Sequence, residues 1–380
     1  MKLLEYQAKE ILASLGIAIP PGAVAHTPDE AAAACEKLGP VAVKAQVPVG
    51  GRGKAGGIKL ARTPEEARAA AQQIIGMDIK GFKVPLVYCE TALDIAREIY
   101  VGFTVDRDAR ANVLLLSAKG GMDIEQVAEE SPDAIARLYP SPWRGPLDFE
   151  LTQLAFDAEL GELTRPLSAV IKKLYRAIPE YDALTAEINP LVVTKAAEVV
   201  AGDAKLEIDD NAAWRHRDLE QKYGSVIEGD PYEVEAKKRS LTYVSLDGEI
   251  GIIGNGAGLC MGTLDLVQRA GGKPANFCDI GGGAKAEVVE NALAVILMNP
   301  RVKGVLINVF GGITRGDEVA KGIVTARDNL KMKLPLVVRL SGTNEEEGRA
   351  ILEQHGIEPG VNAWAAAQKI VELTRAGARA

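Results

Sequence analysis

A glycine-rich segment between two expected strands carries the strongest chemical signal in this sequence of 380 residues. The apolar run 41–47 leads into residues 50–57, which contain five glycines together with Arg52 and Lys54, and the run 58–60 follows. Backbone N–H groups and two cations in such a loop can surround phosphate groups. The segment is neither a Walker A loop nor a Rossmann loop, because alanine follows Lys54 and a strand comes next. By itself, a flexible hairpin with a basic tip fits the segment equally well.

Charged residues in the neighbouring apolar strands are further candidates for ligand contacts. Lys44 lies inside the strand before the loop, and a buried lysine is unfavourable unless it meets an anion. An alternating strand can instead place Lys44 on a solvated face. Glu90 ends the apolar run 84–88 and precedes Glu98, and its carboxylate can accept hydrogen bonds from an adenine amino group or a ribose. A solvated acidic turn explains these two glutamates equally well.

A second group of polar residues has the composition of a magnesium site. Glu187 and Asn189 are two residues apart in the expected strand 183–193 and therefore share one face of it. After a turn near 195–198 the chain returns, so that Asp203 can lie opposite Asn189. An amide oxygen and a carboxylate suit magnesium, which takes few protein oxygens and completes its shell with water and phosphates. Two ordinary polar residues near a turn would show the same spacing.

The sequence offers no convincing nucleophile. None of the three histidines, at positions 26, 216 and 355, lies in a glycine-rich loop, and no Gly-x-Ser-x-Gly motif occurs. The four cysteines lack Cys-x-x-Cys spacing, which argues against a zinc or redox motif and favours reduced thiols. The chain therefore carries groups for binding without the reacting group of a complete enzyme.

Two regions of different pattern must position these residues. Residues 1–230 mix helices with strands, and a charged stretch at 231–240, expected to include a short helix, links them to residues 241–380. In that last region apolar strands alternate with helices, which predicts a doubly wound parallel α/β sheet. The strands are expected at 249–254, 275–280, 302–310 and 334–340, and the helices at 259–270, 286–298, 317–327, 345–355 and 364–375.

Glycine ends each of these four strands, at positions 254, 281, 311 and 342. In open parallel sheets the ligand crevice lies outside the carboxyl ends of the strands. Glycine there lets backbone N–H groups approach a ligand, and the helix that follows favours an anion at its N-terminus. The pattern predicts a ligand or anion site at this edge, and tight turns alone are the alternative.

Composition excludes several classes of protein. The formal net charge of −8 does not favour nucleic acid as a partner. No apolar stretch approaches the roughly 18 residues that a membrane span needs. Residues 1–16 are expected to form an amphipathic helix, because apolar residues recur at helical spacing and Glu5, Lys9 and Glu10 interrupt any apolar run. They are therefore not expected to be a signal peptide, and we expect a cytoplasmic protein.

Seven motifs complete the sequence evidence, at residues 4–10, 44–46, 50–57, 186–191, 255–258, 279–284 and 308–313. Taken together they resemble the beta subunits of ADP-forming succinate–CoA ligases, and the likeness runs from residue 1 to near 380. The resemblance implies an ATP-grasp fold for residues 1–230 and a flavodoxin-like domain after the linker. It also implies a partner alpha subunit, which binds CoA and carries a histidine that becomes phosphorylated. The implied reaction, a step of the tricarboxylic acid cycle, reversibly converts succinate, CoA and ATP or GTP into succinyl-CoA, ADP or GDP, and phosphate.

The resemblance also assigns roles to single positions in this sequence. Glu187 would be the catalytic group that orients the phosphohistidine, and Asn189 and Asp203 would hold Mg²⁺. The helix that starts after Gly312 would aim its positive N-terminal end at the phosphohistidine dianion. The acid substrate would be bound by Asn255, Gly312, Ile313 and Thr314. The nucleotide would be contacted by Lys44, Gly51, Arg52, Gly53, Glu90, Leu93 (through its backbone) and Glu98.

Several points stay open at the level of sequence. Pro48 stands where the family commonly has histidine, and proline removes an N–H donor and stiffens the entry to the loop. This departure leaves the closing motion of the loop and the nucleotide preference open. Succinate and malate differ by one hydroxyl, so the large subunit of a malate–CoA ligase is an alternative. The sequence also does not settle whether the nucleotide is ATP or GTP, or whether the two subunits form a heterodimer or a heterotetramer. A non-catalytic nucleotide-sensing module is the alternative from another class, but a sensor has less need of Glu187, Asn189 and Asp203 together.

Overall fold

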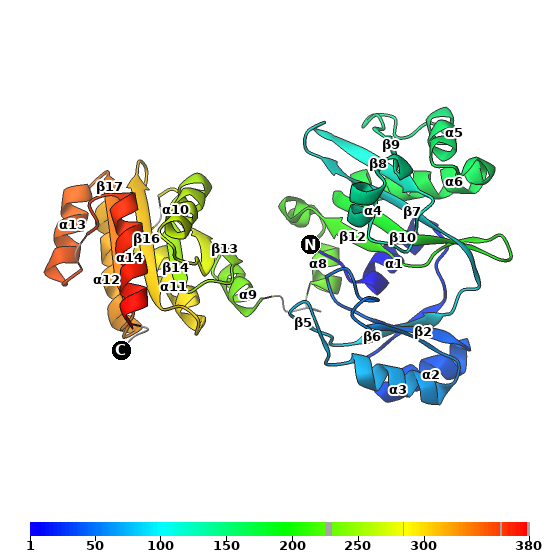
Figure 1. Cartoon of the computed structure of the whole chain (residues 1–380), viewed down its shortest axis with the longest axis horizontal. Helices are drawn as coiled ribbons and strands as arrows, with labels where there is room; N and C mark the ends of the chain where they lie inside the picture. The colour runs from blue at the N-terminus through cyan, green and yellow to red at the C-terminus, as the bar shows by residue number, and fades with distance from the viewer. Residues whose placement is uncertain (225–229, 284, 358, 378–380) are drawn as a thin grey trace. The chain divides into compact units, whose positions relative to one another are not determined.

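The computed structural model describes residues 1–224, 230–283, 285–357 and 359–377. These residues form two compact units, Met1–Ile227 and Glu228–Ala380 (Figure 1). Each unit has hydrophobic clusters of its own. All four cysteines are buried free thiols, as expected.

The first unit contains a four-stranded antiparallel sheet backed by two helices. α2 (Pro28–Leu38) and α3 (Pro64–Ile74) cover one face of it (Figure 1). Both helices begin with proline after a threonine cap, Thr27 or Thr63, whose hydroxyl accepts a hydrogen bond from the third helical N–H group. The strand order is β1-β6-β2-β3, for β1 (Gly22–Ala25), β6 (Val87–Thr91), β2 (Val41–Ala45) and β3 (Ile58–Ala61). The glycine-rich loop joins β2 to β3, so this sheet positions it.

The first unit also contains a six-stranded antiparallel sheet. Phe103 of this sheet packs against Tyr175, with ring centroids 5.4 Å apart. The strand order is β11-β10-β7-β8-β9, with β12 also paired to β10, for β7 (Ile95–Asp106), β8 (Ala111–Ser117), β9 (Ala136–Leu138), β10 (Ala183–Thr194), β11 (Val199–Ala201) and β12 (Lys205–Ile208). Other elements of this unit are α1 (Glu5–Ser14), β4 (Asp78–Ile79), β5 (Phe82–Lys83), α4 (Ile124–Glu130), α5 (Asp148–Asp157), α6 (Thr164–Tyr175), α7 (Ala177–Tyr181) and α8 (Arg217–Tyr223).

The register of the β10 hairpin fixes the relation between two predicted site residues. Glu187 on β10 pairs with Lys205 on β12, and Leu191 pairs with Ala201 on β11. Both pairs follow one register, which places Asp203 opposite position 189 as the sequence predicted. The turn closes where it was expected, since the N–H group of Thr194 donates to the carbonyl of Glu198 at 2.8 Å.

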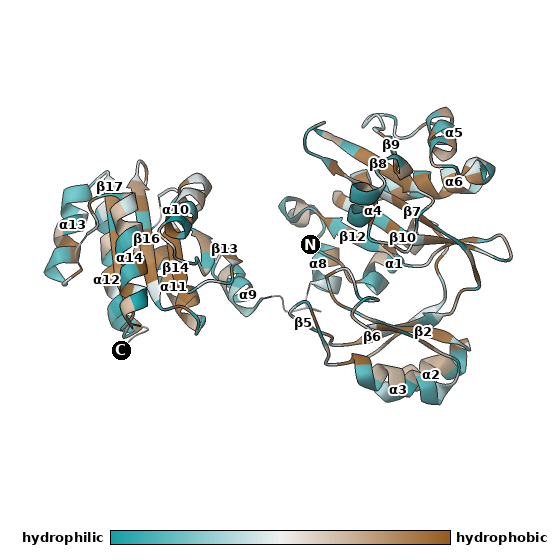
Figure 2. Cartoon of the chain, in the orientation of Figure 1, coloured by the Kyte–Doolittle hydropathy of each residue, from teal (hydrophilic) through white to brown (hydrophobic). Residues whose placement is uncertain are grey.

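The second unit is built on a five-stranded sheet of order β13-β15-β14-β16-β17. Apolar strands lie between helices whose outer faces are polar (Figure 2). Ile252 packs with α10 and α14 on one face, and Ile253 packs with α11 and α12 on the other. The strands are β13 (Thr242–Ser245), β14 (Ile250–Gly254), β15 (Asn276–Asp279), β16 (Gly304–Gly311) and β17 (Leu336–Gly342). The helices are α9 (Pro231–Lys238), α10 (Ala257–Arg269), α11 (Ala286–Met298), α12 (Gly316–Asn329), α13 (Glu345–Gln354) and α14 (Ala363–Gly377).

The predicted alternation of strands and helices is confirmed in this unit, and β14 to β17 run parallel. The edge strand β13 is antiparallel to β15 and was not expected. This strand has only four residues, of which Tyr243 is buried and Ser245 partly buried. Such a short alternation gives too little periodicity to identify a strand from the sequence. Residues 231–240, expected as a linker with a short helix, contain α9, whose Ala236 is buried in the core of the second unit.

Candidate active site

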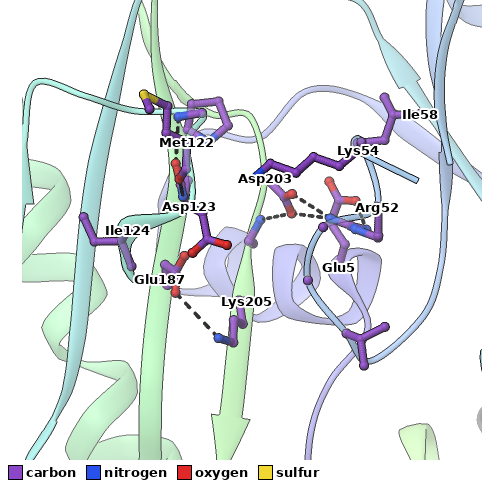
Figure 3. Close-up of a pocket in the computed structure, with 18 of the residues that line it drawn as sticks. Glu5, Arg52, Lys54, Ile58, Met122, Asp123, Ile124, Glu187, Asp203 and Lys205 are labelled. Carbon is purple, nitrogen blue, oxygen red and sulfur yellow. Dashed lines mark hydrogen bonds and ion pairs between the residues drawn. The ribbon is translucent and has the colours of Figure 1, made fainter. Parts of the chain in front are cut away.

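A cavity of about 600 Å³ lies in the first unit beside the glycine-rich loop. Its walls come from the loop at 47–54, the segment 121–125 and the hairpin that contains β10 and β12 (Figure 3). Pro48, the departure from the family pattern, lines the cavity where the chain enters the loop. The predicted site residues that line this cavity are Gly51, Arg52, Gly53, Glu98, Glu187, Asn189 and Asp203.

The loop folds back on itself and needs glycine at two of its positions. The N–H groups of Ala55 and Gly57 donate to the carbonyls of Gly51 and Arg52, at 3.1 and 2.8 Å. Gly51 has φ of +85°, a conformation that strains other residues. A Cβ atom at Gly57 would lie 2.9 Å from the side chain of Ile79 in β4. The strands on both sides therefore hold the loop in a compact turn against the β4–β5 hairpin.

Arg52 connects this loop to the β10 hairpin (Figure 3). Its Nη2 donates to both carboxylate oxygens of Asp203, at 2.8 and 2.6 Å, and its Nη1 donates to Glu5 at 2.6 Å. Burial disfavours the charge on Arg52, but Asp203 and Glu5 outweigh burial and raise its pKa. Phosphate oxygens that enter the cavity would therefore compete with two carboxylates for the same guanidinium.

A buried cluster of charges lies behind Arg52. Lys44 on β2 donates to Glu5 at 2.9 Å and to the carbonyl of Gly202 at 2.7 Å, and it also pairs with Glu90. Lys9 on α1 contacts the same three groups, with Glu5 at 3.0 Å and the Gly202 carbonyl at 2.9 Å. The carbonyl of Gly202 thus accepts hydrogen bonds from two lysines, which ties the hairpin to the four-stranded sheet.

The charges of this cluster balance. With Arg52 and Asp203 it contains three cations and three carboxylates, and all except Asp203 have side chains less than a tenth exposed. Burial raises the pKa of Glu5, but Arg52, Lys44 and Lys9 outweigh burial and hold it well below the usual value. Burial raises the pKa of Glu90, and the two lysines offset this only in part. Removal of any one member would leave an uncompensated buried charge.

Three predicted nucleotide residues do not line the cavity. Lys44 and Glu90 belong to the buried cluster, where Lys44 meets the anionic partners that its position in an apolar strand required. Leu93 lies in the connection between β6 and β7. Their contacts with a nucleotide stay predictions.

Glu187 and Asn189 occupy the wall of the cavity opposite the loop. The Glu187 side chain is 16% exposed, and its carboxylate lies 3.8 Å from the ammonium group of Lys205. Burial raises the pKa of Glu187, and Lys205 lowers it in part. The Asn189 side chain accepts from the N–H group of Gly121 and donates to the carbonyl of Met122, both at 2.8 Å. Asn189 therefore fixes the segment that brings Asp123 and Glu125 to the cavity.

The donor set at this wall fits Mg²⁺. Asn189 offers an amide oxygen and Asp203 a carboxylate, in one cavity and at opposed positions of one hairpin. Magnesium takes few protein oxygens and leaves the rest of its shell to water and phosphate. Among the described residues no group of three or more His, Cys, Asp or Glu side chains is arranged as a metal site, so a metal here would depend on substrate oxygens.

The second unit places its predicted substrate residues at the carboxyl edge of its sheet. Asn255 follows β14, and its side chain donates to the carbonyl of Phe310 at 2.9 Å and accepts from the Phe310 N–H group at 2.9 Å. Thr314 is buried and accepts from the N–H group of Gly283 at 2.9 Å. Gly312 and Ile313 are exposed, Ile313 to 84%. β14 and β16 flank the point where the strand order reverses, which is where open α/β sheets bind ligands.

Comparison with known proteins decides the family. A profile of the ATP-grasp domain matches residues 2–193, and a profile of the CoA-ligase domain matches residues 253–370. The GDP-forming succinate–CoA ligase subunit beta of Thermus thermophilus is 55% identical over 354 residues, which cover 93% of each chain. The ADP-forming subunit beta of Rubrobacter xylanophilus is 48% identical over 382 residues, which cover 99% of this chain and 100% of that one. This chain belongs to the family of succinate–CoA ligase beta subunits.

The family confirms the predicted fold class of an ATP-grasp domain followed by a flavodoxin-like CoA-ligase domain. An ATP citrate lyase from Methanothrix soehngenii has a similar fold, with a TM-score of 0.73 and 20% identity over 99% of both chains. Among the described residues no helix has the length and apolar character needed to cross a membrane.

Sequence reasoning missed the roles of Glu5 and Lys9 in this beta-subunit fold. Both residues were treated as polar interruptions of an amphipathic helix, yet their side chains are almost fully buried. Their separation of four residues places them on one face of α1, and the buried Leu12 follows Lys9 one turn later on the same face. A glutamate and a lysine on the apolar face of a helix were the available signal.

Glu5→Gln is expected to lower the free energy of unfolding of the first unit by about 3–5 kcal/mol, because it leaves three buried cations with two carboxylates. Urea unfolding of this variant and of wild type measures the loss. Glu10→Gln is the matched control on the same helix, since Glu10 pairs with Lys222 near the surface and such pairs contribute about 1 kcal/mol or less. Equal losses in the two variants would contradict the assignment of a balanced buried cluster.

Proposed function

We propose that this chain is the nucleotide-binding subunit of a succinate–CoA ligase and is active only with a partner alpha subunit. Together they would catalyse the reversible reaction of succinate, CoA and ATP or GTP to succinyl-CoA, ADP or GDP, and phosphate. The observation that carries the proposal is the single cavity that joins the glycine-rich loop, Arg52, Asp203, Asn189 and Glu187.

The cavity supplies what phosphoryl transfer needs, which is mainly position and compensating charge. Backbone N–H groups of the loop and the Arg52 guanidinium would bind the phosphates, with Arg52 exchanging Asp203 and Glu5 for phosphate oxygens. Asp203, once released, and Asn189 would hold Mg²⁺, which when bound neutralises charge on the phosphates. Lys44 would keep its charge for the nucleotide, because Glu5, Glu90 and Asp203 outweigh burial and raise its pKa.

Glu187 would orient the partner's histidine. In the first step the bond from the terminal phosphorus to the bridging oxygen breaks and a bond from phosphorus to a histidine nitrogen forms. The Glu187 carboxylate accepts a hydrogen bond from the other ring N–H group, which fixes the tautomer and supports the charge on the ring. No nucleophile of this chain is needed in that step, in agreement with the absence of a candidate in its sequence.

The second unit would bind the carboxylic acid substrate. In the next steps the phosphoryl group passes from histidine to a succinate carboxylate, and the CoA thiol then displaces phosphate from the acyl phosphate. Asn255, Gly312, Ile313 and Thr314 would contact the acid. The N-terminus of α12, which begins at Gly316, would stabilise the phosphohistidine dianion.

Kinetics with two acids test this proposal. The chain, purified with its cognate alpha subunit, is assayed for kcat/KM with succinate and with malate, in the presence of magnesium-ATP and CoA. We expect a preference for succinate of about tenfold or more, equivalent to roughly 1.4 kcal/mol at the transition state. A preference for malate would change the substrate but keep the mechanism, and absence of turnover with both acids would contradict the proposal.

The same assay with GTP settles the nucleotide. Relatives of both names match this chain, the GDP-forming one at 55% identity over 93% of it and the ADP-forming one at 48% over 99%. We propose a nucleoside triphosphate as the substrate class. The ratio of the kcat/KM values for ATP and GTP determines which base is preferred.

A further inference from the structure

A short hairpin beside the glycine-rich loop contains an unusual lysine. β4 and β5 pair Asp78 with Lys83 and Ile79 with Phe82, so Lys80 and Gly81 form a two-residue turn. Both turn residues have positive φ, +54° for Lys80 and +87° for Gly81. Positive φ at both central residues defines a type I′ turn, in which asparagine, aspartate or glycine is favoured at the first position. A lysine there is strained, and the turn itself gives no reason for it.

The position of this turn relative to the loop is fixed by packing. The Ile79 side chain lies against Gly57 at the end of the loop, where a Cβ atom would come within 2.9 Å of it. The Lys80 ammonium nitrogen lies 3.4 Å from the point where a Cβ atom of Gly51 would be. Lys80 lines the same cavity as Arg52 and Asp203, although it comes from a separate hairpin. The hairpin therefore presents the Lys80 ammonium group directly over the first turn of the loop.

Lys80 differs from Arg52 and Lys205, which also line the cavity, because no carboxylate is paired with it among the described residues. Four cations line the cavity: Arg52, which is paired with Glu5 and Asp203; Lys205, which lies 3.8 Å from Glu187; and Lys54 and Lys80. Lys54 and Lys80 form no hydrogen bond or ion pair with any residue that the structure describes. Their charge acts on the opposite wall of the cavity, since a hydrogen bond with Glu125 and, to a smaller extent, these two lysines lower the pKa of the exposed Asp123.

We propose that Lys80 is a further phosphate-binding residue, which contacts the terminal phosphates of the nucleotide from the side opposite Arg52. This inference rests on the proposed function, because it needs a nucleotide in this cavity. An ammonium group that forms no hydrogen bond or ion pair with the described residues, held at a strained turn over the glycine-rich loop, has a use when an anion enters. Lys80 thus adds a cation that the nucleotide can engage without first displacing a carboxylate, as it must at Arg52.

Binding of ADP and AMP to the complex of this chain with its alpha subunit tests the inference by isothermal titration calorimetry. Lys80→Gln is expected to weaken ADP binding by about tenfold or more and AMP binding by much less, because AMP lacks the terminal phosphate. The deficit for ADP should shrink as salt is added. Lys83→Gln removes the same charge from the same hairpin, outside the cavity lining, and is expected to bind ADP within twofold of wild type.

A second variant separates a binding role from a structural one. Lys80→Asn places a residue that tolerates positive φ at the strained position, so we expect the melting temperature to rise by about 2 °C while ADP binding falls as in Lys80→Gln. ADP affinity within twofold of wild type in both Lys80 variants would overturn the inference and leave the proposed function intact. Failure of the wild-type complex to bind ADP at all would overturn both.

Discussion

Asp203→Ala is expected to lower turnover of the complex by about a thousandfold or more. Asp203 offers the carboxylate opposite Asn189 and accepts two hydrogen bonds from Arg52. Its loss removes the charged ligand proposed for Mg²⁺ and also releases Arg52 from the hairpin. The expected result is loss of both ATP-dependent phosphorylation of the partner and succinyl-CoA formation.

Two measurements make this result specific. Binding of Mn²⁺, followed by electron paramagnetic resonance with ADP present, should weaken in Asp203→Ala along with turnover. Asp157→Ala, at the exposed end of α5, is the control and should change neither quantity. Turnover near the wild-type rate in Asp203→Ala would show that the metal assignment is wrong.

Glu187→Gln is expected to lower kcat by about 10²–10⁴-fold while the affinity for ADP stays within a few-fold of wild type. Glutamine keeps the shape of the side chain but replaces a charged acceptor by a neutral amide, which supports a histidine ring poorly during transfer. Separate measurements of ADP affinity and of partner phosphorylation distinguish this effect from damage to the nucleotide site. A parallel loss of ADP affinity would contradict an orienting role.

The pH profile gives an independent test of Glu187. Burial raises the pKa of this carboxyl, and the orienting role needs its ionised form. Activity should therefore fall on the acid side through a pKa above that of an ordinary glutamate. In Glu187→Gln that acid limb should be absent from the remaining activity. An unchanged limb in the variant would assign the titration to another group.

Local patterns in the sequence were enough for much of this architecture. The apolar strands of the second unit, each closed by glycine, predicted its sheet correctly, since buried parallel strands produce continuous apolar runs. The opposition of Asn189 and Asp203 followed from one turn and the regular spacing of a hairpin. The requirement of Lys44 for an anion followed from its apolar surroundings.

Contacts between distant segments could not be predicted in this way. Lys44 pairs with two carboxylates, Glu5 of α1 and Glu90 of β6. Arg52 pairs with Glu5 and with Asp203, which is 151 residues further along the chain. Nothing in the local pattern around Glu5 indicates that it will bind two cations from the loop and its strand. The position of Lys80 was equally hard to predict, because its hairpin has strands of only two residues and is placed by the packing of Ile79 against Gly57.

Transfer of the terminal phosphoryl group tests the central claim most directly. The complex of this chain with its alpha subunit is incubated with magnesium-ATP carrying a radioactive γ-phosphate, without succinate or CoA, and the label on each chain is measured. We predict near-stoichiometric, acid-labile label on the alpha subunit, and almost none in complexes that contain Asp203→Ala or Glu187→Gln. Label on this chain instead, or equal labelling with the two variants, would contradict the account.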